Sequence, residues 1–190
     1  SLGGRDNEYT AAGMPKDQRM GRLVEGVEVM RRLWSEQDVS FAGRYYALDA
    51  ANIAPKPKRQ GGIPVIFGAT TPPSLARAGR LADGFMKNRG WCEAEEFAAL
   101  NDQGTDAAVK AGRYPNEIRR IINGAAYVAS DPDDVRARAE QGTGIGGFMN
   151  AGLIGTVEEI LDIIRGYRHA GVDTFGIRFP AGQVVEQMKR

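Results

Sequence analysis

The first third of the chain carries a helical pattern followed by two short extended segments. Apolar residues recur at spacings of three and four over residues 15–34, which predicts one long amphipathic helix. Two runs rich in β-branched and aromatic residues, at 39–41 and 45–48, predict a short hairpin or a pair of extended segments. Residues 55–62 are rich in proline, glycine and basic side chains, which is typical of a connector.

After residue 62, short apolar runs alternate with helical stretches. The continuous apolar run at 63–67 is typical of a strand buried on both faces, and the run at 118–129 is expected to break around Asn123-Gly124. Strands that alternate with helices predict βαβ units and a parallel sheet. The predicted strands are 63–67, 84–86, 118–129 and 174–179, and the predicted helices are 72–81, 92–110, one beginning at Pro132, 156–170 and 184–189.

Local signals mark several helix ends. Asp131 precedes Pro132, which predicts an N-cap followed by proline at the first helical position. Thr156 stands three residues before Glu159, the spacing of a capping box. Gly171 follows the same helix and is predicted as its C′ residue.

The alternation predicts an α/β fold, an incomplete barrel of the (β/α)8 class. A full barrel needs about 250 residues, and this chain has 190. The pattern shows about four strands after residue 60 and a further strand end at Ser1-Leu2-Gly3. We expect one domain over residues 1–190, with four to five βα units and the hairpin as a small insertion. The chain begins at Ser1 rather than at Met, so we expect it to be cut from something longer.

The amino-acid composition limits the kinds of binding partner that we expect for this chain. The chain is 42% hydrophobic and 26% charged, with a formal net charge of +1. This balance predicts no general attraction to nucleic acid or to a membrane surface. No apolar run approaches the roughly 20 residues of a membrane span. The single cysteine, Cys92, suits a reducing compartment, so we expect a cytoplasmic protein.

The first candidate site follows the strand predicted at 63–67. A glycine at the end of a strand lets the backbone approach a ligand, and the first turn of the next helix offers free amides to an anion. Pro72 and Pro73 lack amide hydrogens, so the donors are expected to come from the residues around them. A capped helix start, with Thr71 as the cap, is the plainer alternative. The candidate phosphate-binding residues are Gly68, Ala69, Thr70, Thr71 and Ser74.

Basic residues near other strand ends are further candidates, since ligands of barrels gather at the carboxyl ends of the strands. Lys87 and Arg89 follow the strand at 84–86 and are predicted as phosphate partners, with a solvated basic loop as the alternative. Arg178 interrupts an apolar strand. A buried arginine needs an anion, so we expect Arg178 to face either the site or an acidic neighbour, and we favour the site.

Three other motifs give weaker indications of a functional site. Residues 142–147 match G-x-G-x-x-G, but a helix precedes them where a dinucleotide site requires a strand, so a loop or lid is expected. His169 lies in the last turn of a predicted helix and is expected to be a surface residue. Cys92 has no histidine near it in sequence, so neither a catalytic thiol nor a metal site is predicted.

The motifs, taken in order, resemble luciferase-like flavin-dependent oxidoreductases over most of the chain. No single piece is decisive, but the ordered set is specific. The matching pieces are Gly4-Arg5-Asp6-Asn7-Glu8-Tyr9, Ala12-Gly13-Met14-Pro15, the helix ending Leu33-Trp34, residues 39–46, Pro55-Lys56-Pro57, Pro64-Val65-Ile66-Phe67-Gly68, Ala76-Arg77, Ala82-Asp83-Gly84-Phe85, Gly155-Thr156-Val157-Glu158-Glu159 and Ala170-Gly171-Val172-Asp173.

The resemblance implies a TIM barrel that binds FMN, or alternatively the deazaflavin coenzyme F-420. Residues 1–54 would hold the end of strand four, the long helix and the hairpin, and residues 63–190 would hold strands five to eight. The loop after strand five, Gly68 to Thr71, would grip the flavin phosphate. Lys87 to Gly90 would follow strand six, and Arg178 would lie on strand eight. The flavin would perform the redox chemistry.

The resemblance also implies an activity: oxidation or reduction of a small organic substrate. A monooxygenase with reduced FMN and O₂ is the favoured type, in which case a flavin reductase is a partner. No catalytic residue is assigned. The family's opening strands have no counterpart, and Gly4 stands where sugar-phosphate dehydrogenases of the family carry a glutamate.

Two other functions stay open. The first is a truncated, non-catalytic flavin- or phosphate-binding protein that needs a partner to complete the barrel. The second is an aldolase-like or isomerase-like barrel without flavin, although no lysine or histidine constellation supports it. Half a barrel leaves strand edges and a core face exposed, so a homo-oligomer is expected.

Overall fold

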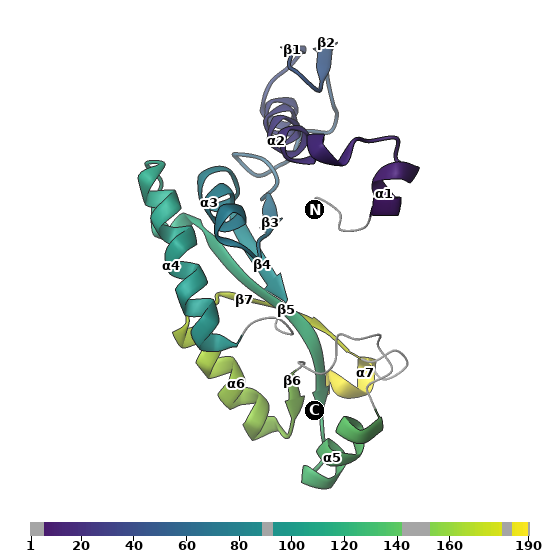
Figure 1. Ribbon diagram of the computed structural model, residues 1–190, viewed down its shortest axis with the longest axis vertical. Coiled ribbons are helices and arrows are strands. Elements are labelled where there is room, and N and C mark those ends of the chain that lie inside the picture. Colours follow the sequence, from purple (N-terminus) through teal and green to yellow (C-terminus); the bar gives the residue numbers. More distant parts are fainter. Residues whose placement is uncertain (1–5, 89–92, 142–152, 180–183, 190) are drawn as a thin grey trace. The chain divides into compact units, whose positions relative to one another are not determined.

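The computed structural model describes residues 6–88, 93–141, 153–179 and 184–189, and the chain divides into two compact units (Figure 1). The first unit is Ser1–Val65 and the second is Ile66–Arg190. The expected strand end at residues 1–3, Arg89, Cys92 and the glycine-rich segment 142–147 lie outside the described residues.

The first unit is built on one long helix and a hairpin, as predicted. The predicted helix forms, although its first turn is a 3₁₀ turn, and the short helix α1 is an addition that the pattern did not indicate. The elements are α1 (Asp6–Ala11), η1 (Lys16–Gln18), α2 (Arg19–Ser35), β1 (Val39–Ala42) and β2 (Ala47–Ala51), with β1 and β2 antiparallel.

Glu25 ties the hairpin turn to α2. Its carboxylate accepts hydrogen bonds from the backbone amides of Arg44 at 3.1 Å, Tyr45 at 2.8 Å and Tyr46 at 2.7 Å. Charge-assisted bonds of this kind are roughly twice as strong as neutral ones. One side chain therefore holds the register between helix and hairpin.

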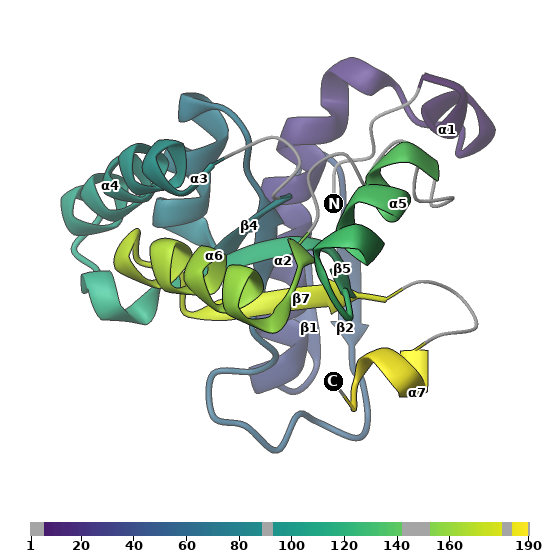
Figure 2. The ribbon, with the colours of Figure 1, turned by 90° about the horizontal axis from the view of Figure 1, so that it is seen from below.

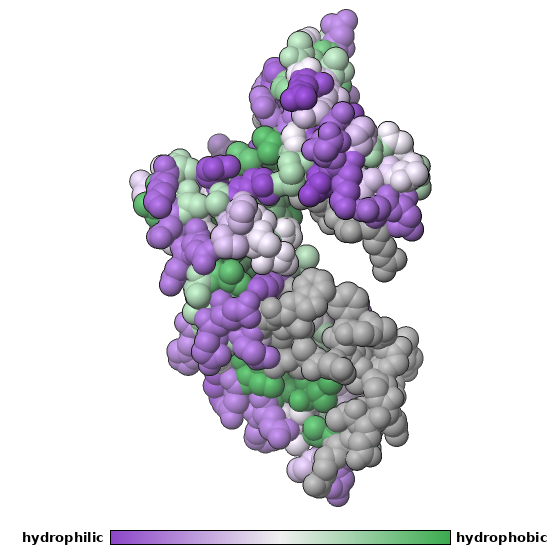
Figure 3. Space-filling model, viewed as in Figure 1, coloured by the Kyte–Doolittle hydropathy of each residue, from purple (hydrophilic) through white to green (hydrophobic). Residues whose placement is uncertain are grey.

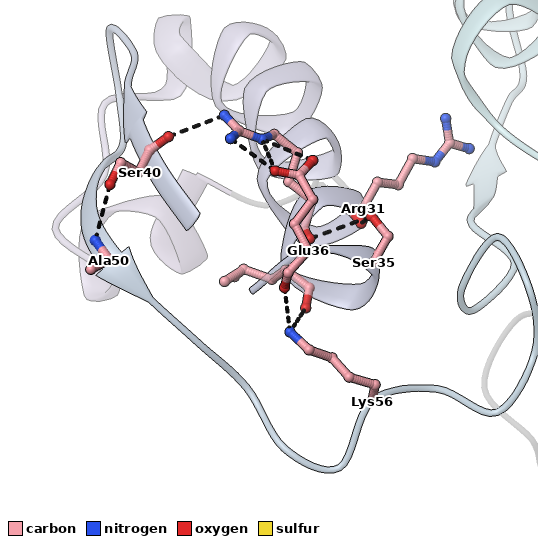
Figure 4. Close-up of polar contacts among 8 residues, drawn as sticks. Arg31, Ser35, Glu36, Ser40, Ala50 and Lys56 are labelled. Carbon is pink, nitrogen blue, oxygen red and sulfur yellow. Dashed lines mark hydrogen bonds and ion pairs between the residues drawn. The ribbon is translucent and has the colours of Figure 1, made fainter. Parts of the chain in front are cut away.

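A second cluster closes the carboxyl end of α2 (Figure 4). The Lys56 ammonium donates to the carbonyl oxygens of Leu33 at 2.7 Å and Glu36 at 2.6 Å. The Arg32 guanidinium donates to the Glu36 carboxylate and to the Ser40 carbonyl. The hydrogen bond to Glu36 raises the pKa of Arg32 above its ordinary value. A cation at this end also complements the helix dipole.

The second unit alternates strands and helices around a parallel sheet. Strand β5 is central: it pairs with β4, β6 and β7, and β3 pairs with β4, all in parallel. The elements are β3 (Ile66–Gly68), α3 (Pro72–Leu81), β4 (Gly84–Asn88), α4 (Ala94–Lys110), η3 (Pro115–Glu117), β5 (Arg119–Val128), α5 (Pro132–Gln141), β6 (Leu153–Gly155), α6 (Val157–His169), β7 (Thr174–Arg178) and α7 (Val184–Gln187).

Two predicted strands differ from the structure. Strand β3 begins at Ile66 rather than at Ile63, which is 54% exposed, and only Phe67 of the apolar run is buried. The expected break at Asn123-Gly124 is wrong, because β5 is continuous and both residues pair with β7. Strand β6 is short and was not predicted.

An aromatic chain joins the sheet to its helices. Phe85 of β4 stacks on Phe97 of α4, with ring centroids 5.8 Å apart. Phe97 meets Tyr167 of α6 edge-on, and Tyr167 meets Phe175 of β7 in the same way. Figures 1 and 2 show α3, α4 and α6 along one side of the strands. The core of this unit therefore lies between the sheet and these three helices.

The predicted helix caps of this unit are confirmed. Asp131 accepts from the amides of Asp133 at 2.9 Å and Asp134 at 3.0 Å. Thr156 and Glu159 form the reciprocal capping box of α6. Figure 3 shows that the outer surface of α6 is mostly hydrophilic, with hydrophobic surface beside it.

The last helix is held to the sheet by one side chain. Gln187 is 3% exposed; its Oε1 accepts from the Val128 amide at 2.7 Å, and its Nε2 donates to the Val128 carbonyl at 3.3 Å. The glutamine amide thus bonds β5 as a neighbouring strand would.

Within the described part of the chain, no helix is long and apolar enough to cross a membrane.

Candidate functional site

Side chains alternate between the two faces of the sheet in the second unit. Phe85, Ile122 and Phe175 face the helices; Ile122 and Phe175 are register partners, and Phe85 is the register partner of Arg120. The residues next to them along each strand face the other side, which we call the open face because most of its side chains are half-buried or exposed. The open face carries Ile66, Gly68, Met86, Ile121, Asn123, Thr174, Gly176 and Arg178.

The turn from β3 to α3 gathers backbone amides at one point. Both the Thr70 amide at 3.0 Å and the Thr71 amide at 2.9 Å donate to the Ser74 hydroxyl oxygen. That hydroxyl in turn donates to the Thr71 carbonyl at 2.7 Å. The turn is therefore both a helix start, as the plainer interpretation holds, and a cluster of donors at the positive end of a helix.

Gly68 ends β3 beside open space. A Cβ added there would meet nothing within 4 Å, and the residue is exposed. By contrast, Ala69 is fully buried, and its amide donates to the Met86 carbonyl at 3.1 Å. The sheet thus holds Ala69 firmly while Gly68 leaves its backbone open to close approach.

Arg178 lies at the carboxyl end of β7 on the open face. The expectation of burial is wrong, because the residue is exposed. Its register partner is Ala125, and both lie on the same face as Asn123 and Gly176. Among the described residues, none pairs with its guanidinium. The cation is therefore available to an anionic group on this face.

Lys87 lies on the opposite face of the sheet. It shares a register row with Ile122, is 5% exposed, and its ammonium bonds the Glu96 carboxylate of α4 at 3.0 Å. A buried cation of this kind requires a partner anion, and the helix layer supplies one. The structure thus does not bring Lys87 together with Gly68 and Arg178.

Register also separates Arg178 from the turn after β3. Gly68 lies level with Thr174 across three strand spacings, and Arg178 is four residues further along β7. With strands about 4.8 Å apart and about 3.3 Å per residue, the two backbones lie roughly 20 Å apart in a flat sheet. One phosphate group cannot contact both.

Asn123 is a polar open-face residue that the sequence reasoning missed as a site candidate. Its Oδ1 lies 2.8 Å from the position of a Cβ added at Gly176, so its side chain leans over β7. The signal was present: an amide side chain inside the apolar run 118–129. The sequence pattern predicts a strand break there instead, because asparagine and glycine are rare in strand interiors.

Other chemistry is sparse in the described residues. Within residues 6–88, 93–141, 153–179 and 184–189, no three His, Cys, Asp or Glu side chains are grouped to hold a metal ion. His169 is an exposed residue at the end of α6, and its Nδ1 lies 2.7 Å from the Arg165 carbonyl. This confirms the expectation of a surface helix residue.

The first unit contains a largely apolar cavity of about 360 Å³ beside α2. Its lining includes Tyr9, Leu23, Met30 and Tyr46, with Arg19 and Arg22 as the charged members. None of the predicted site residues lines it.

The comparisons with known proteins place the chain in a family. The model of the luciferase-like monooxygenase family matches residues 2–152, so the chain belongs to that family. It is 34% identical over 126 residues to an F420-dependent glucose-6-phosphate dehydrogenase of Nakamurella multipartita, covering 66% of this chain and 35% of the relative. The corresponding enzyme of Mycolicibacterium fortuitum is 38% identical over 116 residues, covering 61% of this chain and 33% of the relative.

Solved structures share the fold. A monooxygenase from Streptomyces bottropensis superimposes with a TM-score of 0.82 at 23% identity, covering 98% of this chain and 64% of that one. An F420-dependent secondary alcohol dehydrogenase in complex with an F420–acetone adduct gives a TM-score of 0.72 at 22% identity, covering 90% and 59%. The predicted α/β fold related to the TIM barrel is thereby confirmed, as a partial one. The chain spans about a third of the length of the curated relatives it matches.

Proposed function

We propose that this chain forms part of an oxidoreductase that uses coenzyme F420 or FMN, with the cofactor bound on the open face of the sheet. The observation that carries the proposal is the turn after β3, where Gly68 borders open space and the Thr70 and Thr71 amides converge on one hydroxyl. Coenzyme F420 is the preferred cofactor, since the named relatives at 34% and 38% identity are F420-dependent.

In this proposal the turn holds the cofactor phosphate. Gly68 leaves room for the phosphate beside the backbone. The Ser74 hydroxyl rotates away, and the amides of Thr70 and Thr71 then donate hydrogen bonds to the phosphate oxygens instead. The amino-terminal end of α3 adds its partial positive charge. Ala69, bonded to Met86, keeps the turn in place.

Arg178 serves another part of the bound molecules. Because it lies roughly 20 Å from Gly68 in a flat sheet, we assign it to an anionic or polar group of the substrate or of the far end of the cofactor. We assign Lys87 a structural role instead: its ion pair with Glu96 joins β4 to α4.

The cofactor, when bound, supplies hydride or electron transfer. The residues of the chain bind it, orient it and exclude water from one side. We propose a small organic molecule as the substrate, and a flavin reductase as a further partner if FMN is the cofactor.

We further propose that β3, β4, β5 and β7 correspond to strands five to eight of a barrel. Among the described residues, β3 and β7 each pair with only one strand, so both are sheet edges. Exposed edges favour pairing with another chain. We therefore expect a homo-oligomer, or else a partner segment that completes the barrel. Sedimentation of the purified chain as a monodisperse monomer would contradict the homo-oligomer.

The alternative is a cofactor-binding protein without catalysis of its own. The observation that favours it is how little of a relative's length the chain matches: it covers 35% of the Nakamurella relative. The two functions separate in one assay: binding of the cofactor without its reduction by any tested alcohol or sugar phosphate would support the alternative.

The test of the proposal is a fluorescence and absorbance titration of the purified chain with coenzyme F420 and with FMN. Gly68→Val is the informative variant: a Cβ added at Gly68 meets nothing within 4 Å, so we expect the fold to stay intact. We expect it to weaken binding of the preferred cofactor by about tenfold or more, which is at least about 1.4 kcal/mol. Unchanged stability in urea would show that the loss is local.

The matched control is Gly166→Ala in α6, where the added Cβ makes an ordinary contact of 3.7 Å with Ala94. We expect this variant to bind the cofactor as the unaltered chain does. Binding of neither cofactor, or equal affinity of the Gly68→Val variant and the unaltered chain, would refute the proposed site.

A further inference from the structure

Asn123 and Gly176 form a matched pair on the open face. They are register partners in β5 and β7. A Cβ at Gly176 would lie 2.8 Å from Asn123 Oδ1, 3.5 Å from its Cγ and 3.7 Å from its Cβ. The asparagine side chain therefore occupies the space that any other residue at position 176 would fill.

The fold itself does not require asparagine at position 123 or glycine at position 176. Asparagine and glycine both disfavour a strand interior, and Asn123-Gly124 brings the two together in the central strand. Gly176 has no positive φ, so its backbone does not require glycine. Residues that break a local rule without benefit to the fold are expected at functional sites.

The position of Asn123 suits a bound molecule that begins at the turn after β3. In a flat sheet its backbone lies roughly 12 Å from Gly68 and roughly 8 Å from Arg178, counted in strand spacings and residues. Asn123 is half-buried, between Ile121 and Ala125 on the same face. An amide side chain has two donors and two acceptor lone pairs. Asn123 already has an interaction partner within the protein, and an amide with this many hydrogen-bonding sites can bond a ligand as well.

We infer that Asn123 contacts the cofactor, hydrogen-bonding the uncharged, oxygen-bearing ribityl or ring portion of a flavin or deazaflavin whose phosphate is held at Gly68. Gly176 is a positioning residue that gives the Asn123 amide its room. This inference rests on the proposed function, and it adds a recognition point that is independent of the phosphate.

The experiment compares three probes: FMN, riboflavin and inorganic phosphate, with coenzyme F420 and its phosphate-free deazaflavin riboside as a parallel pair. Asn123→Ala is expected to raise the Kd for FMN and for riboflavin by the same factor, about threefold to tenfold, which is the loss of one neutral hydrogen bond. The Kd for inorganic phosphate is expected to stay unchanged. Gly68→Val is expected to act on FMN and phosphate more than on riboflavin.

A double-mutant cycle tests the role of Gly176. Gly176→Ala alone displaces the amide and is expected to weaken riboflavin binding about as much as Asn123→Ala does. Added to Asn123→Ala, it is expected to cause no further loss, because the atoms that it strikes are gone. Additive losses would overturn the positioning role. Asn101→Ala, in the helix layer, is the matched control, and its riboflavin affinity is expected to be unchanged.

The outcomes separate this inference from the proposed function. If Asn123→Ala leaves both flavin affinities unchanged while Gly68→Val weakens FMN binding, only the inference on Asn123 fails. It also fails if Asn123→Ala weakens phosphate binding equally, since the effect is then general. If the unaltered chain binds none of the probes, the proposed function fails and this inference with it.

Discussion

Gly79 and Gly166 are both helical glycines of the second unit, yet an added methyl group meets very different surroundings at the two positions. At Gly79 in α3, a Cβ would lie 2.4 Å from the Gly104 carbonyl oxygen of α4 and 3.0 Å from the Ala108 amide nitrogen. At Gly166 in α6, the nearest atom is the Ala94 Cβ at 3.7 Å. The same substitution therefore tests the packing of α3 on α4.

The magnitude follows from that geometry. Cβ atoms essentially never come closer than 3.0 Å to such an atom, so Gly79→Ala must move backbone by about 0.6 Å, from 2.4 Å to 3.0 Å. Overpacking of this kind costs about 1–3 kcal/mol, and a backbone clash belongs at the upper end. Both variants gain about 1 kcal/mol from replacing a helical glycine. We expect Gly166→Ala to stabilise by about 1 kcal/mol and Gly79→Ala to destabilise by about 2 kcal/mol.

Urea denaturation and thermal unfolding measure both variants against the unaltered chain. The helix propensity gain is common to the two, so their difference of about 3 kcal/mol reports the packing cost alone. For a unit of this size it corresponds to a gap of roughly 10 °C in Tm. Equal stability of the two variants would refute the close approach of α3 and α4.

Substitutions at three further contacts test one interaction each. Thr156→Ala removes the α6 cap and is expected to cost about 1 kcal/mol in urea unfolding, with Thr156→Ser close to the unaltered chain; a null effect of the alanine variant would contradict the cap. Lys56→Met removes the cation at the carboxyl end of α2 and is expected to cost about 1 kcal/mol and to speed hydrogen exchange in the last turn of α2; unchanged exchange would argue against the contact. Glu96→Gln leaves the buried Lys87 ammonium without its anion, and we expect a loss of about 1–2 kcal/mol that Lys87→Met in the same background recovers; no recovery would show that Glu96 acts otherwise.

Helices of this chain are predictable from sequence because their signals are local. Thr156 and Glu159 mark the start of α6 within four residues, and α3 runs from Pro72 to Leu81 as the pattern indicates. Strand limits depend on remote partners instead. β5 runs through Asn123-Gly124 because β4 and β7 pair along it, and no window of sequence contains those partners.

The same distinction applies to the candidate site. The turn from Gly68 to Ser74 follows a strand and opens a helix, as the residues themselves predict. The face that a strand residue occupies is set by the register of the whole sheet. Lys87 and Arg178 are both basic residues near strand ends, yet the first faces α4 and the second the open face. Only the assembled sheet distinguishes them.

The bond between Gln187 and Val128 has a consequence for handling the protein. A bare strand edge is a template on which other chains aggregate, and the glutamine amide occupies both the hydrogen-bond donor and the acceptor of Val128. α7 has four residues, too few to be a stable helix alone, so it depends on this attachment. Truncation before Gln187, or a bulky fusion that displaces α7, would uncover that edge. We expect the protein to become less soluble while the sheet itself stays folded.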